Sequence, residues 1–327
     1  MTIRRSILQS IAFLLACPAA ALAADPAASY PARPVTIVVP FAPGQSADIL
    51  ARMLGEALGK KWGKPVVVEN NGGAGGAVGS LIVARARPDG YTLLMGSTGP
   101  TSIAPQLSKA AAYDPRKDFA AVIALAGVPQ MMLVPANSPY KSMQDVIDDA
   151  RRNPGKLSYG TGGTGSLAHL TMEMFQHRAG IRLQHIPYKG AGPAYTDLLA
   201  GRLQLMFDTT PAAIGFVRAG QLRFLAASTA TRTDAAPGVP TVAEAGLPGF
   251  EVQGWLGVVA PAGLDPALQS RLNRDFAQVM EEPGIRRKLA DLGMSPIGGS
   301  AQDFQAFIAS EYRKFADVIR TAGISAD

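Results

Sequence analysis

The stretch that decides the fold is "TIVVPFAPGQSADILARMLGEALGKKW", which runs from Thr36 to Trp62. Its first six residues are apolar or β-branched, as is typical of a buried strand. From Ile49 to Trp62 the apolar residues recur at helical spacing and fall on one face, which predicts an amphipathic helix. A strand that leads into a helix through a short Pro-Gly turn predicts an α/β fold.

The same unit continues along the chain. "PVVVEN" (Pro65–Asn70) and "TLLMGS" (Thr92–Ser97) read as two more strands, and "SLIVARA" between them reads as a helix. Strands that alternate with helices predict a βαβαβ unit, with a parallel sheet and right-handed crossovers.

A second series of strands and helices follows the first. The expected strands are Met131–Pro135, Leu157–Thr161, Leu183–Tyr188, Leu203–Asp208, Leu222–Ser228 and Val252–Pro261. The expected helices are Met143–Arg152, Leu167–Arg178, Ala194–Gly201, Pro266–Met280 and Ala301–Ile319. The apolar stripes of the last two helices predict core packing.

A break near Ala124–Gln130 and a Pro/Gly-rich loop at Ala235–Gly249 divide this series into two lobes. We expect residues 24–124 and 245–327 to form one domain and residues 125–244 the other. The closing segment then returns to the first lobe, so two segments cross between the lobes. Ligands of open α/β sheets bind beyond the carboxyl ends of strands, at helix N-termini, which predicts a cleft between the lobes.

Residues 1–23 predict a cleaved secretory signal, because basic Arg4 and Arg5 precede an apolar stretch and an Ala21-Leu22-Ala23 site. "LLAC" at Leu14–Cys17 also resembles a lipoprotein box, but Pro18 and the site at Ala23 favour free secretion. No later run is apolar and long enough to span a bilayer.

Composition excludes several function classes. Cys17 is the one cysteine, so the mature chain has no disulfide and its core alone must stabilise it. Removing the two leader arginines lowers the formal charge from +6 to +4, and the remaining basic residues are scattered, which argues against nucleic acid. The sequence has no H-E-x-x-H and no P-loop, so we expect no metal and no cofactor.

"LSYGTGGTGSLAHL" (Leu157–Leu170) contains a formal G-x-G-x-x-G at Gly160, Gly162 and Gly165. A dinucleotide site also needs an acidic residue about 20 positions further on, and none lies between Glu173 and Asp197. The motif therefore predicts a glycine loop that leads into a helix and suits an anion, with Ser166 as the N-cap and His169 in the first turn.

Two further loops have suitable chemistry. In "PFAPGQSADIL", Gln45 or Ser46 can cap a helix that has Asp48 in its first turn, and its exposed amides suit a carboxylate. An ordinary capped helix explains this loop equally well. In "PYKGAGPAYTDLL", Tyr188 can stack on a ligand or donate a hydrogen bond to it.

An exported hydrolase that uses Ser46 or Ser166 with His169 is the rival interpretation, but no G-x-S-x-G elbow exists, so we expect no catalytic residue.

Taken in order, "PFAPGQSADILAR", "VVVENNGGAGGAVGS", "ARPDGYTLL", "SYGTGGTGSLAHL", "HIPYKGAGPAYTDLLAGRLQLMFD" and "PGVPTVAEAGLPGF" resemble the Bug-type receptors of tripartite tricarboxylate transporters. The resemblance covers nearly the whole mature chain. It implies a two-lobe, Venus-flytrap (type II) periplasmic binding protein that holds a carboxylate between Phe41–Asp48 and Thr161–Ser166. Gln45 departs from the family's usual glycine, and Asn71-Gly72 replaces its usual Arg-Pro.

The expected partners are a small organic acid and either a membrane permease of that transporter type or the ectodomain of a sensor kinase, with the receptor itself a monomer. The expected ligand-binding residues are Phe41, Ala42, Gly44, Gln45, Ser46, Asp48, Ser97, Thr161, Gly163, Thr164, Gly165, Ser166, His169, Tyr188 and Asp208.

Overall fold

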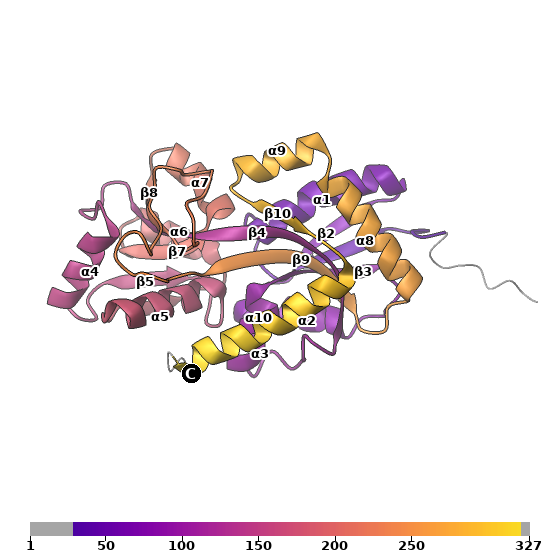
Figure 1. Ribbon diagram of the computed structural model, residues 1–327, viewed down its shortest axis with the longest axis horizontal. Coiled ribbons are helices and arrows are strands. Elements are labelled where there is room, and N and C mark those ends of the chain that lie inside the picture. The colour runs from indigo at the N-terminus through magenta and orange to yellow at the C-terminus, as the bar shows by residue number, and fades with distance from the viewer. Residues whose placement is uncertain (1–28, 322–327) are drawn as a thin grey trace, which may run out of the picture.

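The computed structural model describes residues 29–321, so the expected signal at residues 1–23 and the question of Cys17 lie outside the described residues. The chain forms two α/β lobes, with β4 and β9 running side by side between them (Figure 1).

The first lobe contains the predicted βαβαβ unit. Strand β1 pairs in parallel with β2 on one side and with β3 on the other. Strand β9 joins β3 antiparallel, and β4 continues the sheet. The elements of this unit are β1 (Val35–Val39), α1 (Ser46–Trp62), β2 (Val66–Asn70), η1 (Ala74–Gly76), α2 (Ala77–Ala84), β3 (Thr92–Ser97), the π-helical turn η2 (Gly99–Ile103) and α3 (Ala104–Leu107).

The second lobe is built on strands β5, β6 and β7, which pair in parallel, while β4 adds to β7 antiparallel and also pairs with β8. Its elements are α4 (Met143–Arg152), β5 (Ser158–Thr161), α5 (Leu167–Ala179), β6 (Gln184–Pro187), α6 (Ala191–Leu199), β7 (Leu205–Thr209), α7 (Thr210–Arg218) and β8 (Leu222–Ala227). The expected strands and helices of this lobe are confirmed, and the sequence pattern missed α7.

One long strand, β4 (Phe119–Pro135), runs through the stretch that we expected to be a break. Residues Phe119–Pro129 pair with β9 (Gln253–Pro261), and from Gln130 onward the strand pairs with β7 instead. Gly127 and Pro129 read as loop residues in the sequence, but pairing with β9 on one side and β10 (Ser295–Gly298) on the other keeps this backbone extended. β4 is therefore one of the connections between the lobes.

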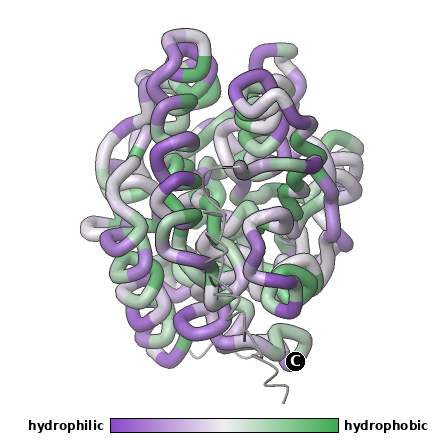
Figure 2. The backbone as a smooth tube through the Cα atoms, turned by 90° about the vertical axis from the view of Figure 1, so that its right-hand side faces the viewer, coloured by the Kyte–Doolittle hydropathy of each residue, from purple (hydrophilic) through white to green (hydrophobic). Residues whose placement is uncertain are grey.

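The closing segment returns to the first lobe through β9 and then forms α8 (Pro266–Met280), α9 (Pro283–Asp291), β10 and α10 (Ala301–Thr321). One core lies between the first sheet and α1 and α8, and a second lies on the opposite face against α10. In the second lobe, α4 and α5 cover one face of the sheet and α6 and α7 the other. In Figure 2 the outer coils alternate between hydrophilic and hydrophobic residues, as surface helices do.

Candidate functional site

A pocket of about 690 Å³, counting the space at its open mouth, lies between the two lobes. The ends of β1, β3 and β7 reach it, as do β4, β9 and the N-termini of α1, α5, α6 and α7. Its lining residues are Phe41, Gln45, Ser46, Ser97, Thr98, Gly99, Val128, Gln130, Gly162, Ser166, Leu167, Ala168, Ala191, Met206, Phe207, Asp208, Thr209, Gly254, Trp255 and Leu256. We call this pocket the cleft.

The N-terminus of α1 is open toward the cleft. Gln45 occupies the N-cap position in an extended conformation, but no side chain caps the helix, so the expected cap by Gln45 or Ser46 is wrong. The first N–H groups of a helix have no partner within the helix and carry partial positive charge. Because Gln45 and Ser46 both line the cleft, this end of α1 suits an anion.

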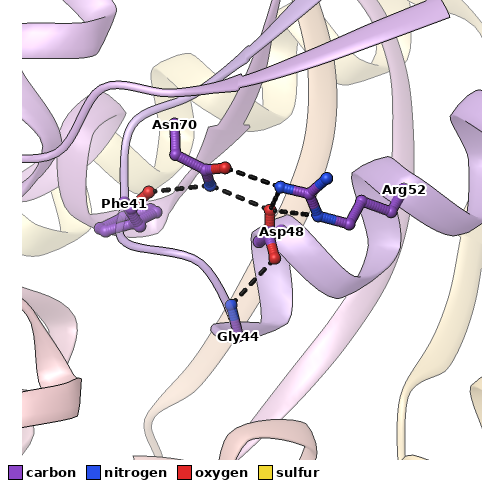
Figure 3. Close-up of polar contacts among 5 residues, drawn as sticks. All are labelled: Phe41, Gly44, Asp48, Arg52 and Asn70. Atoms are coloured by element: carbon purple, nitrogen blue, oxygen red, sulfur yellow. Dashed lines mark hydrogen bonds and ion pairs between the residues drawn. The ribbon is translucent and has the colours of Figure 1, made fainter.

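Asp48 fixes the shape of the loop that leads to this helix end (Figure 3). Its carboxylate accepts hydrogen bonds from Gly44 N at 2.9 Å, Arg52 Nε at 2.9 Å and Asn70 Nδ2 at 2.9 Å. Asn70 also donates to the Phe41 carbonyl at 3.1 Å. Burial favours the neutral acid, but these hydrogen bonds outweigh it and hold the pKa of Asp48 below its usual value. Asp48 is thus committed to the loop and does not line the cleft.

Two histidines, His169 and His185, contact the glycine loop of the second lobe (residues 161–166). Thr161 Oγ1 lies 2.7 Å from His185 Nε2, and Gly165 N donates to His169 Nδ1 at 3.4 Å. The His185 ring stacks on His169 at 4.3 Å and on Tyr159 at 4.9 Å. Burial first, and then the neighbouring His169, lowers the pKa of His185 to about 4, so its ring is neutral at neutral pH.

Ser166 caps α5, as the sequence predicts, by accepting a hydrogen bond from His169 N at 3.3 Å. The cap leaves Ser166, Leu167 and Ala168 at the cleft wall, where the start of α5 contributes backbone amides. The two loops named by the sequence therefore reach the same cleft from opposite lobes.

The lobes touch each other through glycines at the cleft rim. A Cβ atom added to Gly75 would lie 3.0 Å from Thr164 O and 3.0 Å from the carbonyl carbon of Gly165. A Cβ atom on Gly190 would lie 3.2 Å from Ala42 Cβ. At Gly75 backbone lies against backbone, and at Gly190 the backbone lies against the Ala42 methyl group, so this is a closed arrangement of the two lobes.

Several buried polar atoms of the cleft lining lack a hydrogen-bond partner of good geometry. They are Ser97 Oγ, Gln130 Oε1, Asp208 Oδ2, Thr209 Oγ1 and Trp255 Nε1. Buried polar groups are normally paired, so a cluster of unpaired ones in a single pocket points to a polar ligand. These side chains come from four different strands, β3, β4, β7 and β9.

Asp208 is the one charged side chain among the described residues that line the cleft. Its Oδ1 accepts a hydrogen bond from Thr209 N at 2.7 Å. The hydroxyls of Tyr195 and Thr209 lie near the carboxyl group without meeting hydrogen-bond geometry. Burial dominates over these contacts and raises the pKa of Asp208 from 3.8 to about 6.

We expect Asp208→Asn to stabilise the unliganded protein at neutral pH. Because the folded-state pKa of Asp208 is raised, this group costs no stability below about pH 4, costs an increasing amount as pH rises to about 6, and costs a constant amount above that. The variant lacks this penalty, so it should be more stable by about 2–3 kcal/mol near pH 7 and similar to wild type near pH 4. Denaturant unfolding at both pH values measures the difference, and a variant that is less stable at neutral pH would contradict the assignment.

The structure places six of the expected ligand-binding residues at the cleft wall: Phe41, Gln45, Ser46, Ser97, Ser166 and Asp208. The others are not among the lining residues: Ala42, Gly44, Asp48, Thr161, Gly163, Thr164, Gly165, His169 and Tyr188. Gly44 has open space around it, and the Tyr188 hydroxyl donates to Asp197 Oδ2 at 2.6 Å. Sequence reasoning missed Gln130, Thr209 and Trp255, whose signal was a polar or aromatic residue inside or just after an apolar strand.

Within residues 29–321, no group of acidic, histidine or cysteine side chains could hold a metal ion. No helix in that range is both long and apolar enough to cross a membrane.

Comparisons with known proteins support the arrangement. Residues 50–324 match the family described as "Tripartite tricarboxylate transporter family receptor". Protein BugT of Bordetella pertussis (strain Tohama I) is 36% identical over 306 residues, which cover 93% of this chain and 93% of BugT.

Two solved structures are also similar. Rpa4515 of R. palustris, solved with adipate, has a TM-score of 0.88 and 37% identity, and the match covers 90% of this chain and 99% of that one. MatC (Rpa3494) from Rhodopseudomonas palustris, solved with bound malate, has a TM-score of 0.84 and 31% identity over 89% of this chain and 100% of that one.

Proposed function

The chain belongs to the tripartite tricarboxylate transporter receptor family, and from that premise we propose that it captures a small organic acid in the cleft between its lobes and releases it unchanged. The observation that carries the proposal is the cleft itself. Open helix N-termini, which suit a carboxylate, line the same pocket as unpaired hydroxyl, amide and indole groups.

The chemistry of the relatives supports this ligand class. The two similar structures described above were solved with adipate and with malate, both of which are carboxylates. The cleft of this chain has no cationic side chain among its described lining residues, so the ligand's carboxylate would be bound by backbone amides and hydroxyls rather than by an ion pair.

We propose further that residues 1–23 direct export to the periplasm and that the receptor delivers its ligand to a membrane permease of the same transporter system. No contact in the described part of the chain favours a sensor kinase as the receiver. The hydrolase interpretation is also poorly supported, because the Ser166 hydroxyl accepts the α5 capping bond from His169 N, and the His169 ring accepts a bond from Gly165 N.

A thermal-shift panel tests the function. We expect at least one acid among succinate, glutarate, adipate, malate, citrate, aspartate, glutamate and nicotinate to raise the unfolding temperature. A ligand at about 100 times its Kd stabilises by about 2.7 kcal/mol, which corresponds to roughly 5 °C or more for a chain of this size. A panel without any shift would contradict the proposal, and so would chemical consumption of the ligand that binds.

A further inference from the structure

The described lining of the cleft combines helix N-termini with a single buried carboxylate. Toward α1 and α5, the helix N-termini present uncapped or partly capped amides and hydroxyls, which favour a negative group. Toward β7, the lining presents the Asp208 carboxylate and, on the neighbouring strand β4, the amide of Gln130, which are 8% and 2% exposed. The Gln130 backbone pairs with Thr209 and the Met131 backbone with Asp208, so both lining residues come from this end of the β4–β7 pair.

The carboxylate has the hydroxyls of Tyr195 and Thr209 near it but no cationic side chain among the described lining residues. Tyr195 of α6 is the titratable side chain that faces it, and burial raises the pKa of that phenol well above 10, so the phenol stays neutral. The lining residues that come from α1, η2, α5, β4 and β9 are all uncharged. Asp208 Oδ1 is used by Thr209 N, while Oδ2 has no partner of good geometry. The unused oxygen is a hydrogen-bond acceptor, and it has no cation beside it.

We propose that Asp208 sets the ligand specificity of the cleft by requiring that the ligand group turned toward it carries a proton. The ligand is then an organic acid whose far end bears an ammonium group, or a dicarboxylate that binds together with one proton from solvent. A fully ionised dicarboxylate would place two like charges in a buried site, which is costly unless one of them is neutralised. The inference rests on the proposed function and narrows its ligand class.

The raised pKa of Asp208, about 6, supports this reading, because the site already favours the protonated carboxyl before any anion arrives. A second carboxylate beside Asp208 would raise the pKa of Asp208 further. Binding of a dicarboxylate should therefore become weaker by about tenfold for each pH unit above about 6 and should take up about one proton. An ammonium group brings its own proton, so its binding should depend little on pH in that range.

Calorimetric titration with matched pairs tests the inference. The probes are succinate, glutarate and adipate, and the amino acids with the same carbon skeletons, aspartate, glutamate and 2-aminoadipate. Titrations at about pH 6 and pH 7.5, in two buffers of different ionisation enthalpy, measure affinity and proton uptake in the wild-type protein. Asp208→Asn is the test variant, and Asp317→Asn, whose side chain is 72% exposed on α10, is the control.

Because Asp208 is already half ionised at pH 6, we expect a binding dicarboxylate to lose roughly 15-fold in affinity between the two pH values and to take up close to one proton at pH 7.5. In Asp208→Asn this pH dependence should disappear, since the amide can donate to a carboxylate. A binding amino acid should keep its affinity across pH in the wild type and lose at least about tenfold in the variant. The control should match the wild type.

Dicarboxylate binding without pH dependence or proton uptake in the wild type would overturn the inference while leaving the receptor function intact. The inference would also be overturned if the wild type and Asp208→Asn had equal affinities for every probe that binds, at both pH values. Failure of all six probes, when another acid of the thermal-shift panel binds, would also overturn the inference, whereas failure of every acid in both sets would contradict the carboxylate function itself. The wild-type proton-uptake measurement stays decisive even if the variant does not fold.

Discussion

Replacing Gly75 by alanine is expected to lower the affinity for the bound acid by about 100-fold while leaving the fold intact. Gly75 lies in η1 of the first lobe, and its added Cβ would meet backbone atoms of Thr164 and Gly165 in the second lobe at 3.0 Å. Backbone cannot move aside as a side chain can, so the lobes must separate by a few tenths of an ångström at this contact, which works against full closure. A ligand that is gripped from both sides loses the contacts that form only on closure.

Gly63 provides a matched control for this prediction. It has φ 63° and ψ 20°, against φ 65° and ψ 19° for Gly75, so alanine introduces the same left-handed strain at both positions. That strain costs about 1 kcal/mol of stability in each variant. An added Cβ at Gly63 meets nothing within 4 Å. Calorimetry should therefore find wild-type affinity in Gly63→Ala and weak binding in Gly75→Ala, and equal affinities would show that closure does not involve this contact.

Replacing Asp48 by alanine is expected to reduce both stability and affinity. The change removes the acceptor for Gly44 N, Arg52 and Asn70, which are the bonds that hold the loop before α1 (Figure 3). Arg52 stays half-exposed and can be solvated, so we expect a loss of about 2–3 kcal/mol, somewhat less than for a fully buried pair. Affinity should fall about tenfold, because the loop no longer holds Gln45 and Ser46 at the cleft.

The loss of stability should depend on pH in a defined direction. The pKa of Asp48 is lowered in the folded state, so its stabilising effect is present above about pH 4 and disappears as pH falls through the lowered value. Denaturant unfolding of Asp48→Ala at neutral and acid pH should show this convergence. Glu56→Ala on the same helix, which removes an exposed pair with Lys60, serves as the control and should leave unfolding and affinity unchanged. A wild-type affinity in Asp48→Ala would contradict the role of the loop.

Local sequence signals predicted the parts of this molecule that depend on local chemistry. The strand-turn-helix stretch at Thr36–Trp62 and the Ser166 cap both came from patterns that neighbouring residues determine. The loop that follows β1 and the glycine loop that precedes α5 both reach the cleft. Parallel strands direct their carboxyl ends to one edge of a sheet, which is why loop positions could be predicted before any contact was known.

Long-range pairing explains what the sequence did not predict. Trp255 lies inside β9 and reads as an ordinary strand residue, while Gln130 fell in the expected break, and only the crossing of β4 and β9 between the lobes places both at the cleft. The expected break at Ala124–Gln130 failed for the same reason, since partners on both sides extend the backbone there. Asp48 was ambiguous locally, because a first-turn acid suits the helix dipole whether or not it contacts a ligand. Asn70 and Arg52 resolve the ambiguity.

The indole of Trp255 offers the most direct measurement of whether the acid binds in the cleft. Trp255 lines the cleft with an unpaired Nε1, whereas Trp62, the other tryptophan, lies outside it and donates to Asp275 at 2.8 Å. In a Trp62→Phe background, titration with the acid from the thermal-shift panel should change the Trp255 emission saturably, with the same Kd as calorimetry gives. Calorimetric binding that leaves this emission unchanged would contradict the account, because the ligand would then lie somewhere other than between the lobes.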